Sequence, residues 1–336
     1  MSARLPLAIE TGGLVLPETG VISVLHPVAS TDLTALPSDR VEVVQPFKPD
    51  FDHFQELGYS CVASGDSPCS VAMVILPRAK ALARALIASA AARSSGVVIV
   101  DGAKTDGIDS MLKDCRKRVE VSGSISKAHG KLFWFVAARD AFADWSAAAQ
   151  QLVDGYVTAP GVFSADGTDP ASDLLARALP WALGKHVVDL GAGWGYLARR
   201  VLKDTAVQRL DLVEADAIAL DCARRNVTDP RARFHWADAT RWNPEQRADT
   251  IVTNPPFHTG RAADPSLGQA FVAAAARMLA PSGHLWMVAN RHLPYERRLD
   301  ESFARVEDVG GDNRFKIFHA TRPRVSGKPV PTRTRR

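Results

Sequence analysis

The sequence predicts an α/β protein in which mostly parallel strands alternate with helices. Three observations support this prediction. Short β-branched runs alternate with Ala- and Leu-rich stretches of helical spacing between residues 69 and 320. A glycine-rich turn joins a strand to a helix at residues 191–195. The chain of 336 residues is long enough for two domains of ordinary size.

The first half of the chain has an irregular start followed by a regular pattern. Residues 1–65 are rich in Pro and Asp, with only short β-type runs at 21–25 and 41–44, and are expected to be irregular. Strands are then expected at 71–76, 97–100, 119–125 and 131–137, and helices at 78–93 and 110–117. Because the loop at 101–107 has the wrong glycine spacing for a nucleotide, this half should be a folded domain without a ligand site.

A segment dense in turn residues, 156–167, follows the expected domain boundary near residue 150. Its Phe163 either packs the connection onto the second domain or contacts a ligand. Asp169 and Pro170 suit the N-cap and first position of a helix that continues to Leu179.

The strand 185–190 runs into the turn Gly191-Ala192-Gly193-Trp194-Gly195 and a helix at 197–202. Dinucleotide enzymes use the spacing G-x-G-x-x-G, whereas the third glycine here comes one position early. Asp189, two residues before Gly191, would repel a pyrophosphate and attract a cation. The turn therefore disfavours a nicotinamide-dependent dehydrogenase and favours a ligand with a positive group, such as S-adenosylmethionine.

The next strands, 209–213 and 232–236, flank a helix at 217–226 and end in acids. Glu214 is suited to accept ribose hydroxyls, and Asp238 is suited to accept from an adenine amine. These side chains should share one edge of the sheet with the glycine turn, since ligands of open α/β sheets bind at the carboxyl ends of the strands.

The fourth strand, 251–253, ends at Asn254-Pro255-Pro256-Phe257. Neither proline has a backbone N–H, so the carbonyls and the Asn254 side chain form a stiff row of acceptors. Acceptors beside an aromatic ring suit a planar ligand that carries an amino group.

The last part of the chain should complete the sheet. A helix at 266–279, a strand at 284–289 and a hairpin of 304–309 and 314–320 are expected. Residues 323–336 should form a flexible basic tail.

Charge is unevenly distributed along the chain. Residues 1–65 carry three Lys or Arg and eight Asp or Glu, net −5, and residues 66–150 carry twelve and eight, net +4. Residues 151–321 are net −1, and the last fifteen residues hold six Arg or Lys and no acid. This pattern is compatible with RNA contact, although a modest charge run is more often a solvated face.

Composition also bears on location and on metals. No apolar window reaches about eighteen residues, and the N-terminus lacks a basic segment followed by an apolar one, which predicts a cytoplasmic protein. The four cysteines and nine histidines show no metal-binding spacing, so neither a structural zinc nor a disulfide framework is expected.

Residues 185–322 resemble the class I S-adenosylmethionine-dependent methyltransferases. The resemblance rests on Asp189, Gly191, Gly193, Gly195, Glu214, Asp238 and Asn254-Pro255-Pro256-Phe257. More narrowly, Pro160-Gly161-Val162-Phe163-Ser164 and the extension His258-Thr259-Gly260 are similar to the bacterial ribosomal RNA guanine-N2 methyltransferases of the RsmC and RlmG kind. That family has tandem Rossmann-like methyltransferase domains, of which the first has lost its cofactor site.

The resemblance implies an organisation for the whole chain. Residues 1–150 would be a degenerate methyltransferase-like domain with an RNA-binding or structural role. Residues 151–322 would be the catalytic domain, with a seven-stranded, mostly parallel sheet and an antiparallel terminal strand. Residues 323–336 would be the basic tail.

The resemblance also implies an activity. The enzyme would transfer a methyl group from S-adenosylmethionine, without a metal, to the N2 amine of a guanine in ribosomal RNA, most naturally of the small subunit. The Asn254 oxygen and the Pro255 carbonyl would hold the amine, Pro256 would stiffen the loop and Phe257 would stack on the base. Phe163 would join the cofactor-binding residues as a lid. Phosphate binding would fall to residues 113–118 and the tail.

Two other readings stay open from the sequence. Asn-Pro-Pro-Phe is shared with adenine-N6 enzymes acting on RNA or DNA, and a related motif occurs in enzymes that methylate protein glutamine. A non-enzymatic RNA-binding or ribosome assembly factor could also keep a methyltransferase fold. The retained acids and Asn254 argue against such an inactive site.

Overall fold

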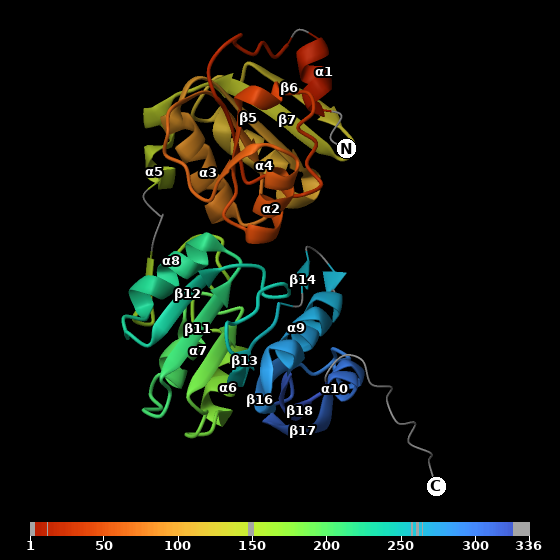
Figure 1. Ribbon diagram of the computed structural model, residues 1–336. Coiled ribbons are helices and arrows are strands. Elements are labelled where there is room, and N and C mark those ends of the chain that lie inside the picture. Colours follow the sequence, from red (N-terminus) through yellow and green to blue (C-terminus); the bar gives the residue numbers. More distant parts are fainter. Residues whose placement is uncertain are drawn as a thin grey trace. The chain divides into compact units, whose positions relative to one another are not determined.

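The computed structural model describes residues 4–11, 13–146, 151–256, 258–259, 262–263 and 265–324. The chain divides into two compact units, which are considered separately. Unit 1 comprises residues 1–151 and 159–161, and unit 2 comprises residues 152–158 and 162–336. Each unit contains one seven-stranded sheet with helices packed on it (Figure 1). The predicted α/β fold with two mostly parallel sheets is confirmed.

The sheet of unit 1 has the strand order β3-β2-β1-β4-β5-β7-β6. The first five strands in this order are parallel, and β7 runs antiparallel to both of its neighbours. The strands are β1 Ile22–Leu25, β2 Val41–Val44, β3 Ser60–Val62, β4 Cys69–Ile75, β5 Ser94–Ala103, β6 Gly123–Lys127 and β7 Gly130–Val136.

Helices cover both faces of this sheet because successive strand residues point to opposite sides. The helices are α1 Arg4–Glu10, α2 Lys48–Glu56, α3 Lys80–Arg93, α4 Ile108–Arg116 and α5 Ala143–Ser146. Side chains of α1 and α2 pack with one face of the sheet, and those of α3, α4 and α5 pack with the other. Each face thus has its own hydrophobic core.

The expectation that residues 1–65 are irregular is wrong. They form α1, α2 and β1 to β3. The three strands have only three or four residues each, too few for a periodic pattern, and the central ones are buried on both faces, which removes the alternation of polar and apolar residues. Leu5, Leu14 and Phe54 are almost fully buried in the core beneath them.

Two smaller expectations also need correction. The strand expected at 119–125 is β6 at Gly123–Lys127, because Val119 and Val121 lie in the connection before it and pack on the core. The helix α10, Glu296–Ser302, was not expected at all. Its polar sequence buries only Leu299 and Ser302, which leaves no apolar stripe to recognise.

The sheet of unit 2 has the order β12-β11-β10-β13-β16-β18-β17. The five strands from β12 to β16 are parallel, and β18 is antiparallel to β16 and β17. They are β10 His186–Leu190, β11 Arg209–Glu214, β12 Ala232–Trp236, β13 Ala248–Thr253, β16 Leu279–Asn290, β17 Phe303–Gly311 and β18 Phe315–Pro323. The expected antiparallel terminal strand is therefore present.

The remaining helices flank this second sheet (Figure 1). They are α6 Pro170–Ala178, α7 Tyr196–Val201, α8 Ala217–Asn226 and α9 Pro265–Met278, together with α10. Side chains of α6, α7 and α8 share one hydrophobic core with the sheet, and those of α9 and α10 share another. The described residues also form two short two-stranded sheets. One lies near the boundary between the units and pairs β8 Gln151–Val153 with β9 Tyr156–Thr158, and the other follows β13 and pairs β14 His258–Thr259 with β15 Ala262–Ala263.

The two seven-stranded sheets have the same strand order, 3-2-1-4-5-7-6, when the strands of each sheet are numbered along the chain. The correspondence extends to single hydrogen bonds after β1 and β10. The His26 amide donates to the Val44 carbonyl at 2.8 Å, and the Gly191 amide donates to the Val213 carbonyl at 2.9 Å. Both donors have a positive φ, 61° and 78°. Unit 1 therefore repeats the fold of unit 2.

Candidate active site

The candidate site lies at the carboxyl ends of β10, β11 and β13. These strands are parallel neighbours, so the loops that leave them meet at one edge of the sheet. The Thr253 hydroxyl at the end of β13 donates to the Leu190 carbonyl at the end of β10 at 2.7 Å. This buried bond fixes the loop that begins at Asn254 beside the glycine turn.

The glycine turn depends on backbone conformations that other residues rarely adopt. Gly191, Gly193 and Gly195 have φ angles of 78°, 54° and 89°. A Cβ at Gly195 would lie 2.9 Å from the Val227 side chain, so crowding also requires glycine there. A Cβ at Gly193 would meet nothing within 4 Å, so at this position the turn leaves room for a ligand to approach the backbone.

Asp189 is fully buried near the end of β10. No hydrogen-bond donor in the described part of the chain meets either of its carboxylate oxygens with good geometry. Burial, and then the charge of Glu214, raise the pKa of Asp189 to about 7, while the weaker influence of the Ala198 amide lowers it. A buried carboxylate without a partner is costly, and a cationic ligand group would compensate for it.

Glu214 at the end of β11 is held by backbone amides. Its two oxygens accept from Gly193 N and Asp216 N, each at 2.8 Å. Burial raises the pKa of Glu214, and these amide hydrogen bonds counteract part of the increase. Each carboxylate oxygen can accept more than one hydrogen bond, so Glu214 ties the glycine turn to β11 and keeps capacity for ligand hydroxyls.

Asp238 follows β12 and stabilises a turn. Its Oδ1 accepts from the Thr240 amide at 2.8 Å and from the Thr240 hydroxyl at 2.7 Å. The side chain therefore has a local structural role in addition to any contact with an adenine amine.

Asn254, Pro255 and Pro256 leave β13 as the sequence predicts. Asn254 is half-buried, Pro255 is buried and Pro256 is exposed. The Asn254 Nδ2 donates to Asp169 Oδ2 and to Ser172 Oγ, both at 2.9 Å. The fourth residue of the motif, Phe257, lies outside the described residues.

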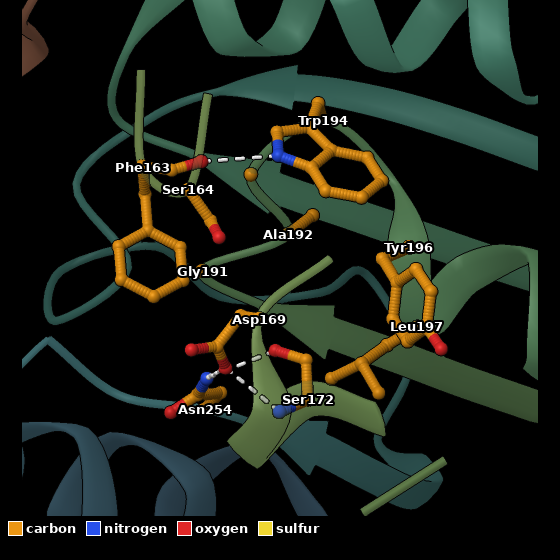
Figure 2. Close-up of a pocket in the computed structure, with 11 residues that line it drawn as sticks. Phe163, Ser164, Asp169, Ser172, Gly191, Ala192, Trp194, Tyr196, Leu197 and Asn254 are labelled. Carbon is orange, nitrogen blue, oxygen red and sulfur yellow. Dashed lines mark hydrogen bonds between the residues drawn. The ribbon is translucent and has the colours of Figure 1, made fainter. Parts of the chain in front are cut away.

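One pocket brings several of these residues together (Figure 2). Phe163, Gly191, Gly193 and Asn254, all expected from the sequence, are among its lining residues. Phe163 is 56% exposed, and its backbone carbonyl accepts from the Trp194 indole N–H at 3.0 Å. The segment around Phe163 is thereby attached to the glycine turn.

Other expected residues do not line this pocket. Asp189, Gly195, Glu214 and Asp238 are absent from its lining. Glu214 instead holds the glycine turn, and Asp238 holds the turn after β12. Conversely, the pocket includes Asp169, Ser172 and Trp194, whose part in the site the sequence did not reveal. Asp169 was recognisable only as an N-cap, because nothing in the sequence connects it with Asn254, 85 residues away.

Neither a metal centre nor a membrane segment is found among the described residues. No group of three or more His, Cys, Asp or Glu there could hold a metal ion. None of the described helices has the length and apolar character needed to cross a membrane. Cys69, Cys115 and Cys222 are buried free thiols, and burial raises the pKa of Cys222 to about 11.

Comparison with known proteins places the site in a family context. The family model described as "Methyltransferase small domain" matches residues 155–319. Three curated relatives are named ribosomal RNA small subunit methyltransferase C. The protein from Hahella chejuensis is 27% identical over 96% of this chain and 95% of its own length. That from Shewanella amazonensis is 30% identical over 80% and 85%. That from Salmonella gallinarum is 33% identical over 70% and 70%.

A solved structure shares the fold along nearly the whole chain. It is the T. thermophilus 16S rRNA N2 methyltransferase RsmC in complex with AdoMet and guanosine. The TM-score is 0.74 at 24% identity, covering 94% of this chain and 92% of the other.

Proposed function

Since the chain belongs to the ribosomal RNA small subunit methyltransferase C family, we propose that it transfers a methyl group from S-adenosylmethionine to the exocyclic N2 amine of a guanine in ribosomal RNA. The observation that carries the proposal is the position of Asn254. Its side chain lines the same pocket as the glycine turn, so an amine acceptor site and a cofactor turn adjoin. We place the reaction in the cytoplasm, where ribosomal RNA is found.

The residues present fit the cofactor. The buried, unpartnered Asp189 carboxylate suits a cationic amino acid end, and the open face of Gly193 allows close approach to the backbone. Glu214 would accept the ribose hydroxyls, Asp238 an adenine amine, and Phe163 would cover the ligand. When bound, S-adenosylmethionine supplies a methyl group already activated by its sulfonium charge.

The chain's own residues act on the nucleophile. A guanine N2 amine is a poor nucleophile because its lone pair is delocalised into the ring. Hydrogen bonds from the amine to Asn254 Oδ1 and the Pro255 carbonyl would orient the nitrogen and favour its pyramidal form. As the N–C bond forms and the methyl–sulfur bond breaks, the amine becomes acidic and loses a proton to water, so no strong general base is needed. Phe257 would stack on the base, which must first leave its helix.

We further propose that unit 1 is a degenerate copy that contributes to RNA binding. Because the two sheets pair their strands in the same register, each residue at a strand end of unit 1 has an equivalent position in unit 2. Three key positions differ in that alignment: Val24 for Asp189, Gln45 for Glu214 and Ile75 for Asn254.

Gln45, at the position that matches Glu214, makes its hydrogen bonds within unit 1, in place of the contact with a ligand hydroxyl that is proposed for Glu214. Its Nε2 donates to the Pro27 carbonyl at 2.6 Å, and its Oε1 accepts from the Phe47 amide at 2.9 Å, so the buried side chain holds the turn of its own unit together. Lys113, Arg116 and Lys117 are exposed near the end of α4 and are available to phosphates of ribosomal RNA or the small subunit.

The test is methyl transfer from labelled S-adenosylmethionine to free ribosomal RNA and to small ribosomal subunits, followed by nucleoside analysis. We expect N2-methylguanosine as the product. Asn254→Ala should lower kcat at least 100-fold because the amine loses its side-chain acceptor, with cofactor affinity within a few fold of wild type. Methyladenosine as the only labelled nucleoside would contradict the guanine assignment, and full activity of Asn254→Ala would contradict the mechanism.

A further inference from the structure

The Asn254 side chain is held in one orientation by two acceptors from the start of α6. Its Nδ2 donates to Asp169 Oδ2 and Ser172 Oγ, both at 2.9 Å. An amide nitrogen carries two protons, and these contacts use both. A carboxylate only accepts hydrogen bonds, so the nitrogen, and not the oxygen, must face Asp169. Figure 2 shows the amide nitrogen turned toward Asp169 and the side-chain oxygen turned away.

The two acceptors are themselves firmly placed. Asp169 is the N-cap of α6, where its Oδ2 also accepts from the Ser172 amide at 2.7 Å. Pro170 follows it at the first helical position and fixes the local backbone. Ser172 is buried in the first turn of the same helix. A single carboxylate oxygen therefore caps the helix and orients the side chain that leaves β13.

This orientation decides what chemical group the pocket can accept. With Nδ2 occupied, Asn254 offers its Oδ1 to a substrate, next to the Pro255 carbonyl in the chain. Two acceptors suit an amino group, which is a donor, and they repel a carbonyl oxygen. If the amide were reversed, Nδ2 would face the substrate amine, and both groups are hydrogen-bond donors. The amine would then lack the acceptor that orients its nitrogen for methyl transfer.

We propose that Asp169, assisted by Ser172, is a positioning residue that sets the Asn254 amide as an acceptor and thereby selects an exocyclic amine as the methyl-accepting group. This inference rests on the proposed function, in which Asn254 holds the reacting nitrogen. Asp169 does not touch the reacting atoms. It acts through Asn254, and its second task as a helix cap must be separated from this one by the choice of variants.

Asp169→Ser makes that separation. Serine is as good an N-cap as aspartate, so α6 keeps its cap, but the shorter side chain does not reach Asn254. We expect kcat for RNA methylation to fall about 10- to 100-fold, the range that follows from misplacing a reacting group. The KM for RNA, the Kd for S-adenosylhomocysteine by calorimetry and the melting temperature should stay close to wild type.

Two further variants distinguish orientation from charge. Asp169→Asn keeps a cap and a carbonyl oxygen that can take both hydrogen bonds, so it should retain most of the wild-type kcat. Asp173→Asn is the matched control, since it removes a carboxylate charge from the same helical turn but keeps an acceptor for the Tyr196 hydroxyl, which lies 2.9 Å from Asp173. It should leave kcat within about two-fold of wild type.

A charge swap tests the contact directly. Asn254→Asp alone sets two carboxylates against each other and should be nearly inactive. The double variant Asp169→Asn with Asn254→Asp restores a donor and acceptor pair in reverse and should recover at least ten-fold in kcat over Asn254→Asp. The proposal is overturned if Asp169→Ser keeps full kcat, if Asp173→Asn loses as much, or if the swap gives no recovery. Absence of RNA methylation by the wild-type protein would instead refute the proposed function.

Discussion

At the scale of single residues, the Asp189 carboxyl is buried where no hydrogen bond from the described residues offsets the cost of its charge. In the folded protein its pKa is raised from 3.8 to about 7. Folding thus favours the protonated form, so the stabilising contribution is complete below pH about 4 and is lost as the pH rises to about 7. Binding of a cation requires the deprotonated form of Asp189, because only the charged carboxylate attracts a cation.

The affinity for S-adenosylmethionine should therefore increase with pH. Between pH 6 and pH 8 we expect roughly a ten-fold gain, the consequence of one group titrating near pH 7. Glu214, whose pKa is also raised, acts in the same direction. Calorimetric titration at both pH values measures the effect, and Asp189→Asn should remove most of it. Equal affinity of the wild-type protein at pH 6 and pH 8 would rule the expectation out.

Single residues also show how far the sequence alone could predict the site. The sequence located Asp189 and Glu214 near the ends of β10 and β11 and Asn254 directly after β13, because ligands of open α/β sheets bind at the carboxyl ends of the strands. The roles of these residues in binding stay predictions. Asp169 and Ser172 were not recognisable as part of the pocket, since a contact across 85 and 82 residues leaves no trace in spacing. Trp194 was visible only as part of the turn, although its indole holds the Phe163 carbonyl.

At the scale of elements, a polar cluster joins the three strands β10, β11 and β12. Asp211 in β11 is fully buried and accepts from His186 Nε2 and His235 Nε2 at 2.7 Å and from Arg209 Nε at 2.8 Å. Burial pushes the pKa of Asp211 upward, but these hydrogen bonds outweigh it and lower the pKa below the ordinary value. The charged carboxylate is thus the form that folding favours.

Asp211→Ala should destabilise the protein by about 3 kcal/mol, because it leaves Arg209 and two imidazoles without their buried partner. Denaturation in urea measures this loss. Glu245→Ala is the control: Glu245 also pairs with Arg209, at 3.1 Å, but its side chain is 80% exposed, so the effect should stay below about 1 kcal/mol. The stabilisation from Asp211 is present above pH about 4 and fades below it, so the deficit of Asp211→Ala should shrink in acid. A deficit independent of pH would contradict this assignment.

Elements differed in how well the sequence predicted them. Helices such as α8 and α9, and strands such as β11 and β12, were found within a residue or two because each has a periodic pattern or an apolar run of sufficient length. The strands β1 to β3 were missed as a sheet because four residues hold no period, and α10 because it buries little. The family resemblance rested on motifs that do not depend on periodicity, and the curated relatives confirm it. The two-sheet plan is confirmed by the strand order of the two sheets.

At the scale of the whole molecule, two copies of one fold should provide a single cofactor site. We expect calorimetry to give one molecule of S-adenosylmethionine per chain. Glu214→Gln gives unit 2 the residue that unit 1 has at the matching position, Gln45, and should weaken binding about 10- to 100-fold because charged hydrogen bonds are lost. A stoichiometry of two, or a second binding phase that survives in Glu214→Gln, would show that unit 1 has kept a site.

The basic end of the chain should supply affinity for RNA without contributing to chemistry. Arg324 belongs to the folded unit, since its amide donates to the Ser302 carbonyl at 2.8 Å and its Nε to the Phe303 carbonyl at 3.1 Å. Truncation after Arg324 therefore removes four cations, Lys328, Arg333, Arg335 and Arg336, and leaves these contacts in place.

Each phosphate contact adds about 0.7 to 0.9 to the slope of log affinity against log salt, so the truncated protein should bind ribosomal RNA more weakly, with a slope reduced by at most about 3.6. Its kcat at saturating RNA should equal that of the full chain, since the pocket lies within residues 163–254. A full-length variant with the four cations changed to Gln separates charge from length and should behave like the truncation. Unchanged affinity and slope in both proteins would contradict this prediction and would assign phosphate binding to the cations around α4. In that case, changing Lys113, Arg116 and Lys117 together to Gln should remove the whole salt dependence.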